Sequence, residues 1–396
     1  MKMSGESLRG SVVQESSSMG MVVVVAVLWM LWVGQAAAAA GSCYPAIFVF
    51  GDSLSDTGNG NLTGRFTSTR TAQRPYGHTF PGFPFARFSD GRLLIDFLAR
   101  FTGLPLLNPS QKSSSDFRTG VNYAVDGATA LDSAFLNSRR IFARTQDSAL
   151  QVQIARHLKL KATSATSSAR ATLLPNPRAF SDGLYVILIA GNDYLSALRR
   201  PKLYPPAVVN KAILPFIISK IRNATEVLYA NGARHFLIFG LPPLGCSPSL
   251  LAGNAMSAKD RYGCLRDINT LSHNHGVQVL AMVDNLRSVY PKANFIYADY
   301  YGAFNHVIKD SASYGLTNTL DACCGAGTLF PYRFKFILFC SRFSTVALTT
   351  LCTNPNTYIS WDGVHFTDKF NADIFDLTIA SGSYLNPSSA FSHCKL

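Results

Sequence analysis

The stretch Ala46-Ile47-Phe48-Val49-Phe50-Gly51-Asp52-Ser53 decides the fold of this chain. Five apolar residues run without interruption into a glycine and two polar residues, which is typical of a strand buried on both faces of a parallel sheet. Three later runs end in the same way. They are Leu184–Ala190 before Gly191-Asn192-Asp193, His235–Phe239 before Gly240-Leu241-Pro242-Pro243, and Ala293–Ala298 before Asp299.

Helical patterns lie between these runs. Residues 207–231 and 273–290 show helical periodicity, and the second pattern stops before Pro291. Alternating strands and helices predict an α/β fold with a central parallel sheet covered on both faces. Ligand sites in such sheets lie at the carboxyl ends of the strands, where the Gly-Asp-Ser and Gly-Asn-Asp tripeptides stand. The Ser-rich residues 109–116 and the Ser, Thr, Ala and Pro-rich residues 161–178 are expected to be loops.

The first 40 residues have the pattern of a secretory signal peptide. Basic Lys2 and Arg9 precede the apolar run Met19–Val33, and the small residues Ala36–Ala40 follow it. We therefore expect a signal peptide over residues 1–40 and a single domain over residues 41–396. A retained signal anchor is the alternative, but the apolar run is short for a membrane span. Entry into the secretory pathway implies a secreted, extracellular (cell wall or apoplast) or a vacuolar protein.

The chain is strongly basic, with a formal net charge of +13. Such a secreted protein is expected to contact polyanions such as acidic wall polysaccharides. No motif typical of nucleic-acid binding is present. Two sequons, at Asn61 and Asn223, are predicted glycosylation sites.

Eight cysteines follow the predicted signal peptide, namely Cys43, Cys246, Cys264, Cys323, Cys324, Cys340, Cys352 and Cys394. An even count in an exported chain indicates up to four disulfides, with at least three expected, but the spacing does not fix the pairing. Zinc binding is the alternative, and the absence of a CxxC pair disfavours it. His273 and His275 have no carboxylate cluster near them in the sequence, so we expect surface or capping histidines there rather than metal ligands.

Ser53 is a candidate nucleophile because it directly follows a buried strand, which would expose its hydroxyl at the sheet edge. A helix cap is the alternative reading of a serine at such a junction. Near the other end of the chain, Asp362 precedes His365 by three residues and could turn back to orient the imidazole as a general base. Here the alternative is a helix-start motif with Asp362 as the cap.

Two further positions could stabilise an oxyanion. Asn192 closes a predicted strand and could donate from its amide, and Gly127 could offer its backbone N–H where a side chain would crowd the substrate. Both stand in turn-forming sequences, so ordinary turns are the alternative explanation.

Taken together and in order, these motifs resemble the blocks of the plant GDSL esterase/lipases, in the SGNH hydrolase superfamily. The resemblance runs from about Tyr44 to Tyr384 and favours the branch that contains sinapine and acetylajmalan esterases. The matching segments are Phe50–Asn59, Asn122–Ala130, Gly191-Asn192-Asp193 and Asp362-Gly363-Val364-His365, with further matches at Ser89-Asp90-Gly91-Arg92, Leu241–Cys246 and Ala322–Gly325.

The resemblance implies a flavodoxin-like three-layer α/β/α fold without a cofactor. It also implies that Ser53 is the nucleophile, that His365 is the base and that Asp362 orients it. The Ser53 N–H, the Gly127 N–H and the Asn192 amide would form the oxyanion hole.

The chain departs from the family pattern in two places. Residues 329–350 are rich in Phe, Ile, Leu and Val, which indicates either a lipophilic lid or a wrongly spliced segment. Position 60 is glycine where the family often has Asn or Leu, beside the sequon at Asn61. Both departures concern substrate preference rather than the type of reaction.

The interpretation is therefore a serine esterase or lipase that hydrolyses acyl esters through an acyl-enzyme on Ser53. An acyltransferase on the same scaffold is the nearest alternative, because an alcohol would then replace water. A non-catalytic wall or glycan-binding protein is the alternative from another class, and the intact set of candidate catalytic residues argues against it.

Overall fold

The computed structural model describes residues 42–64, 71–80, 86–143, 148–166, 173–254, 256–338, 340 and 349–394. Contacts between backbone segments group Cys43–Leu396 into one compact unit. The predicted signal peptide, residues 1–40, lies outside the described residues.

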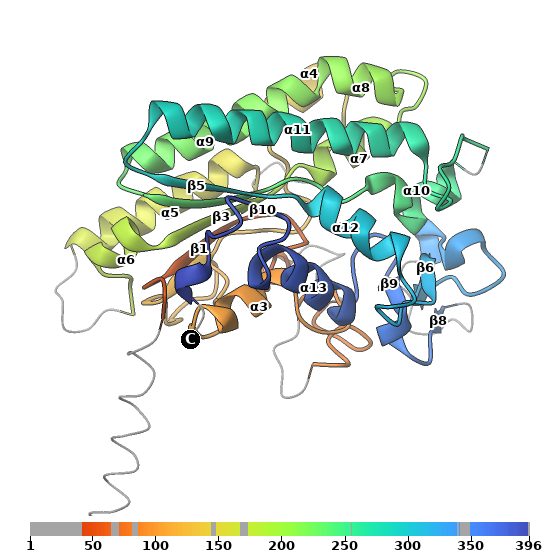
Figure 1. Cartoon of the computed structure of the whole chain (residues 1–396), viewed down its shortest axis with the longest axis horizontal. Coiled ribbons are helices and arrows are strands. Elements are labelled where there is room, and N and C mark those ends of the chain that lie inside the picture. The colour runs from red at the N-terminus through yellow and green to blue at the C-terminus, as the bar shows by residue number, and fades with distance from the viewer. Residues whose placement is uncertain are drawn as a thin grey trace, which may run out of the picture. The chain divides into compact units, whose positions relative to one another are not determined.

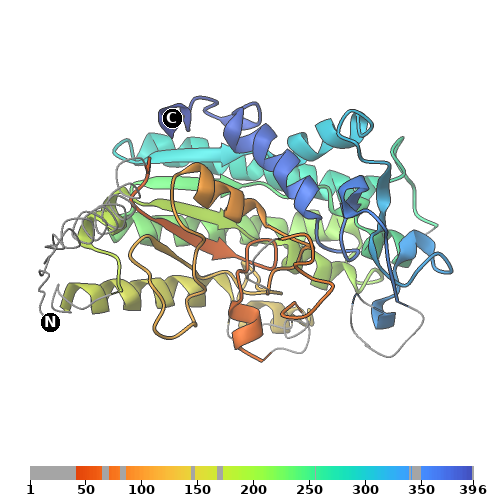
Figure 2. The ribbon, with the colours of Figure 1, turned by 90° about the horizontal axis from the view of Figure 1, so that it is seen from below.

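A six-stranded sheet with the order β10-β5-β4-β3-β1-β2 forms the centre of this unit (Figures 1 and 2). The four strands predicted from apolar runs are all present, and they pair in parallel with one another in the order β1-β3-β4-β5. Two short edge strands were not predicted: β2 is parallel to β1, and β10 is antiparallel to β5. The strands are β1 (Ile47–Gly51), β2 (Gly120–Asn122), β3 (Leu184–Leu188), β4 (His235–Phe239), β5 (Asn294–Ala298) and β10 (Leu385–Asn386).

Helices cover both faces of the sheet because successive residues of each strand point to opposite sides. In β1, Phe48 and Phe50 belong to one hydrophobic cluster, which α5, α7, α9 and α11 cover. Ile47 and Val49 belong to a second cluster, which α3, α12 and α13 cover (Figure 1). The helices are α2 (Asn59–Leu62), α3 (Leu94–Phe101), α4 (Ser133–Ser138), α5 (Leu150–Thr166), α6 (Pro177–Asp182), α7 (Gly191–Leu198), α8 (Pro206–Ala212), α9 (Leu214–Ala230), α10 (Pro248–Gly253), α11 (Arg266–Val289), α12 (Tyr300–Lys309) and α13 (Asp368–Phe375).

The three layers and the parallel strand order 2-1-3-4-5 confirm the predicted flavodoxin-like α/β/α fold. Two small ladders accompany the main sheet. They join β6 (Asn318–Ala322) to β9 (Tyr358–Ser360) and β7 (Cys324–Gly325) to β8 (Thr350–Leu351). The remaining turns are η2 (Leu244–Cys246), η3 (Pro331–Arg333), η4 (Phe336–Leu338), η5 (Pro355–Thr357), the π-helical η6 (Asp376–Ala380) and η7 (Ser392–Cys394).

Several element boundaries differ from the sequence prediction. The pattern over residues 207–231 forms two helices, α8 and α9, which meet at Ile213, and Pro215 in the first turn of α9 lacks the N–H that a continuous helix would use. The second pattern begins earlier than predicted, because α11 starts at Arg266. The predicted loop over residues 161–178 is wrong at both ends, where α5 continues to Thr166 and α6 begins at Pro177.

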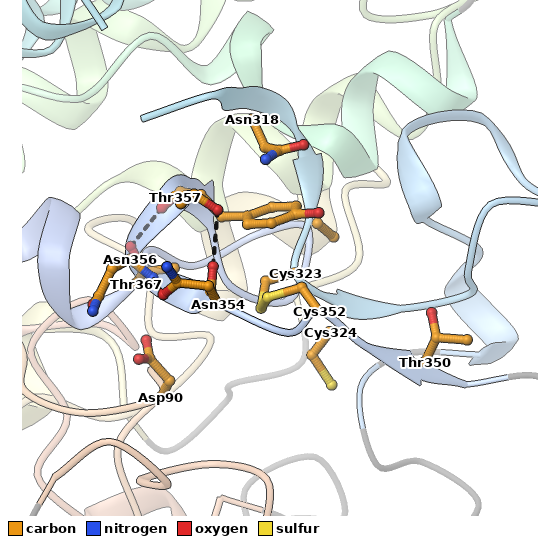
Figure 3. Close-up of a disulfide and its surroundings, with 12 residues drawn as sticks. Asp90, Asn318, Cys323, Cys324, Thr350, Cys352, Asn354, Asn356, Thr357 and Thr367 are labelled. Atoms are coloured by element: carbon orange, nitrogen blue, oxygen red, sulfur yellow. Dashed lines mark hydrogen bonds between the residues drawn. A yellow bond between two sulfur atoms is a disulfide. The ribbon is translucent and has the colours of Figure 1, made fainter. Parts of the chain in front are cut away.

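All eight cysteines form disulfides, as the even count predicted. One bridge ties the start of the compact unit to its end, and another closes the turn after β4. The last two lie around the β7–β8 ladder: Cys323, just before β7, is joined to Cys352, just after β8, and Cys324 of β7 is joined to Cys340. Figure 3 shows the Cys323–Cys352 bridge with Cys324 beside it. The pairs are Cys43–Cys394, Cys246–Cys264, Cys323–Cys352 and Cys324–Cys340.

We expect the denatured, unreduced mature protein to contain no free thiol, because each cysteine has a bonded partner. Titration with a thiol reagent in denaturant measures this directly, and the same titration after reduction supplies the control with eight thiols. Two free thiols per chain before reduction would contradict the four-bridge framework, and four or more would also contradict the sequence expectation of at least three bridges.

The two predicted glycosylation sites lie on helices. Asn223 is exposed on α9, whereas Asn61 is half-buried in α2. Among the described residues, no helix combines the length and the apolar character that a membrane span requires.

Candidate active site

Ser53 lies in the turn that follows β1, at the carboxyl edge of the sheet. The last residue of the strand is fixed by the buried side chain of Gln153 from α5, which accepts from the Gly51 N–H at 2.9 Å and donates to the Gly51 carbonyl at 2.8 Å. After the strand, the Asp52 carboxylate accepts from the Leu54 N–H at 3.1 Å and closes the turn. The Ser53 side chain is therefore held by a rigid backbone.

A second segment approaches Ser53 from the other end of the chain. Between β9 and α13, the chain turns so that the Trp361 N–H donates to the His365 carbonyl at 2.7 Å. Gly363 allows this turn because its φ of +92° lies in a region that side chains disfavour, and because the ring of Phe334 packs where its Cβ would be. The turn places Asp362 and His365 on the same side.

The structure brings Ser53, His365 and Asp362 into one chain of hydrogen bonds. His365 Nε2 lies 2.8 Å from Ser53 Oγ, and His365 Nδ1 lies 2.7 Å from Asp362 Oδ2. All three residues are buried, with only 7% of Ser53 and 5% of His365 exposed. This arrangement can transfer the hydroxyl proton of Ser53 to the imidazole.

Asp362 is fully buried and accepts four hydrogen bonds. Its Oδ1 accepts from the backbone N–H groups of Val364 at 3.0 Å and His365 at 2.8 Å. Its Oδ2 accepts from Nδ1 of the His365 ring and, at 2.8 Å, from the hydroxyl of Tyr76. Burial alone would raise the pKa of the Asp362 carboxyl, but the nearby His365 and these hydrogen bonds outweigh it and lower that pKa.

Asp52 is a second buried carboxyl, next to Ser53 in the chain. Burial raises its pKa to about 6, although the Leu54 N–H and the nearby His365 act in the opposite direction. Because Asp52 and Ser53 line the same cavity, the protonation state of Asp52 influences the electrostatic potential at the Ser53 hydroxyl.

Asn192 and Gly127 lie on neighbouring elements at this edge of the sheet. Asn192 is in the first turn of α7, and its amide donates to the Ala128 carbonyl at 3.1 Å. Gly127 occupies a turn with a φ of +69° directly before Ala128. The next residue of α7, Asp193, holds the same loop by accepting the N–H groups of Ala130 and Leu131, each at 2.9 Å.

A cavity of about 50 Å³ opens beside Ser53, and most of its lining is apolar. The polar side chains at its wall are those of Asp52, Ser53, Asn192, Ser247, Ser360 and His365. Gly127 is not among the described residues that line it. The apolar lining comprises Leu54, Leu195, Pro242, Pro243, Leu244, Pro248, Phe304, Ile359, Val364 and Phe366.

Residues 329–350, the apolar departure from the family pattern, are described only in part. Phe334 is buried against Gly363, whereas Leu329 is 82% exposed. Residues 339 and 341–348 of this segment, which the lipophilic-lid interpretation includes, lie outside the described residues.

In the described part of the chain, one group of His and Cys side chains has the spacing of metal ligands. The group with suitable spacing there is Cys43, His393 and Cys394, but its two sulfur atoms are joined in a disulfide. His275 is fully buried, and its Nδ1 lies 2.9 Å from the Tyr194 hydroxyl.

Sequence reasoning missed two residues that support the site, Tyr76 and Gln153. Each acts over a long separation in the chain, 286 residues for the Tyr76–Asp362 bond and 102 for Gln153–Gly51. No local pattern marks either of them. Asp193, by contrast, stood inside the Gly-Asn-Asp motif, but its role in holding the loop at Gly127 was not predicted.

Comparisons with known proteins identify the family of the chain. Residues 47–378 match the model of the family described as GDSL-like lipase/acylhydrolase. The chain is 36% identical to acetylajmalan esterase 2 of Rauvolfia serpentina, over 85% of this chain and 90% of the relative. It is 37% identical to a GDSL esterase/lipase of Arabidopsis thaliana, over 82% of each chain. The chain therefore belongs to the GDSL esterase/lipase family of carboxylic ester hydrolases.

Proposed function

We propose that this protein is a secreted serine esterase in which Ser53 is the nucleophile, His365 the general base and Asp362 the residue that orients it. The observation that carries the proposal is the continuous hydrogen-bond chain from Ser53 Oγ through the imidazole to Asp362 Oδ2. Nε2 is at the distance that proton transfer from the hydroxyl needs.

The reaction proceeds in two steps. Ser53 Oγ attacks the ester carbonyl while His365 takes the hydroxyl proton, and the tetrahedral intermediate collapses as His365 protonates the departing alcohol. Water then attacks the acyl-enzyme, gives its proton to His365, and the carboxylic acid leaves as Ser53 regains its hydrogen.

The oxyanion of each intermediate is assigned to the N–H groups of Ser53 and Gly127 and to the amide of Asn192. The side-chain amide of Asn192 carries two N–H hydrogens. Within the described residues it makes one hydrogen bond, to the Ala128 carbonyl, so the second hydrogen can be donated to an oxyanion. Asn192 also lies in the first turn of α7, where the aligned peptide dipoles of the helix stabilise a negative charge.

Asn192→Ala should lower kcat by about 10²–10³-fold with little change in KM, because one oxyanion donor is worth about 3 kcal/mol in the transition state. Steady-state kinetics on p-nitrophenyl acetate measure both constants. Asn192→Asp is a matched variant that keeps the size but replaces the donor with an acceptor, and it should be no better than alanine. An unchanged kcat in Asn192→Ala would remove this residue from the oxyanion hole.

The apolar and compact cavity favours an ester with a short apolar acyl group. Two relatives carry the name acetylajmalan esterase, and an acetyl ester is consistent with such a cavity. An acyltransferase would use the same residues, with an alcohol in place of water. Product analysis in the presence of an added alcohol distinguishes the two.

Four disulfides support maturation in an oxidising compartment, and hence a secreted (wall or apoplast) or a vacuolar location. The net charge of +13 supports contact with acidic wall polysaccharide, and the sequons at Asn61 and Asn223 support glycosylation.

Labelling with a fluorophosphonate probe tests the proposed function directly. The probe should modify the purified protein at Ser53, as peptide mass spectrometry would locate, and should block ester hydrolysis in proportion to labelling. Boiled protein is the control. A native protein that hydrolyses esters without reacting with the probe would rule out the serine mechanism, and one that does neither would favour the non-catalytic binding protein.

A further inference from the structure

Tyr76 is buried next to the Asp362–His365 pair but comes from a separate part of the chain. It belongs to the segment of residues 71–80, which precedes α3. Its ring makes edge contacts with Trp361 at 5.9 Å and with Phe88 at 6.2 Å between centroids, and only 1% of the residue is exposed. The Phe88 ring in turn lies 4.5 Å from the His365 ring.

The backbone around Tyr76 is fastened to the segment that carries Phe88. The Gly77 N–H donates to the Ser89 carbonyl at 3.0 Å, and the Thr79 N–H donates to the Asp90 carbonyl at 2.8 Å. The direction of the Tyr76 hydroxyl is therefore fixed by packing on both sides.

The Tyr76 hydroxyl and His365 Nδ1 donate to the same oxygen. Tyr76 lies 2.8 Å and Nδ1 lies 2.7 Å from Asp362 Oδ2, while Oδ1 is occupied by two backbone N–H groups. We propose that Tyr76 is a positioning residue of the reaction, which fixes the Asp362 carboxylate and limits how strongly it stabilises the protonated form of His365. This inference rests on the proposed roles of Ser53, His365 and Asp362.

Two physical effects follow from sharing Oδ2. The hydroxyl fixes the rotation of the carboxylate, so that a lone pair of Oδ2 stays directed at Nδ1. A charge-assisted hydrogen bond also draws electron density from the carboxylate. The carboxylate then stabilises the protonated imidazole less strongly, which favours the neutral form of His365. The base must be neutral before each attack.

Within the described residues, two carboxyls interact electrostatically with His365: Asp362, from its own segment, and Asp52, from the turn after β1. Asp52 belongs to the turn that carries Ser53, whereas Tyr76 acts on Nδ1 through Asp362. A change at Tyr76 therefore alters the electrostatics of one side only, and Asp52→Asn reports separately on the other.

Tyr76→Phe tests the proposal because it removes one hydroxyl and keeps the ring. We expect kcat to fall about 10-fold, KM to stay within about twofold, and the acidic limb of kcat/KM to move to higher pH by about half a unit. Tyr123→Phe is the matched control. Tyr123 is equally buried, at 1% exposed, and within the described residues its hydroxyl has no hydrogen-bond partner.

The pH profile separates a positioning role from a structural one. A lower melting temperature with a uniform loss of activity at every pH would overturn the proposal, and so would a profile and kcat equal to those of Tyr123→Phe. Failure of the proposed function has a different signature, namely ester hydrolysis that persists in Ser53→Ala. Tyr76→Phe is therefore compared with the parent only after Ser53→Ala has shown that ester hydrolysis depends on Ser53.

Discussion

Ser53→Ala is expected to lower kcat/KM for short p-nitrophenyl esters by about 10⁴-fold or more, close to the limit of detection. The substitution removes Oγ, the atom proposed to form the acyl bond, which lies 2.8 Å from His365 Nε2. The donors to the oxyanion and the cavity remain, so substrate binding should persist while turnover stops. The measurement is steady-state hydrolysis together with loss of fluorophosphonate labelling.

Ser55→Ala is the matched control for this substitution. Ser55 lies two residues further along the same turn, is fully buried, and its hydroxyl has no hydrogen-bond partner within the described residues. It should therefore keep nearly all activity and all labelling. Circular dichroism and the melting temperature should be unchanged in Ser53→Ala. Residual turnover in Ser53→Ala within tenfold of the parent would show that another residue attacks the ester.

The main strands were predictable from sequence because each is buried on both faces and so reads as an unbroken apolar run. An apolar run can be recognised as a strand only when the strand is several residues long. The edge strand β2 has three residues and β10 has two, and neither carries enough periodicity to be distinguished from a turn. The break at Ile213 was missed for a different reason, because the apolar pattern continues across it while Pro215 interrupts the hydrogen bonds.

The candidate site was partly predictable for geometric reasons. Asp362 and His365 are three residues apart, so a single turn is enough to bring them together. Ser53 and His365 are 312 residues apart. The rule that sites lie at the carboxyl ends of parallel strands predicted that Ser53 lies in a site, but it did not identify His365 as its partner. The resemblance to a family with this set of motifs supplied the partner.

The supporting contacts were not predictable, because they depend on tertiary packing that no local pattern encodes. Gln153 reads as an ordinary residue of a helix, yet its amide holds both polar groups of Gly51 at the end of β1. The disulfide pairing was equally undetermined, since eight cysteines allow 105 connectivities. The candidate catalytic residues were therefore predictable from sequence motifs, whereas the residues that fix their positions, such as Gln153 and Tyr76, were not.

Asp362→Asn should keep the fold and lower kcat by about 10⁴-fold, because the geometry dictates how an asparagine must orient. Two backbone N–H groups, those of Val364 and His365, point at the Oδ1 position and require an acceptor there, so the amide carbonyl takes that place. The NH₂ group then faces Nδ1 and donates to it. The imidazole is left with its hydrogen on Nε2, where it cannot accept the proton of Ser53.

The pH dependence of the parent enzyme checks the same pair. The base must be neutral to accept the Ser53 proton, so kcat/KM should rise between mildly acidic and neutral pH and then reach a plateau. Asp362 does not produce this limb, because its pKa is lowered and its carboxylate stays charged throughout that range. Asp52, whose pKa burial raises to about 6, could contribute, and a limb that persists in Asp52→Asn assigns it to His365. A profile flat down to pH 4, or near-normal turnover in Asp362→Asn, would show that the Asp362–His365 pair is structural and that another group activates Ser53.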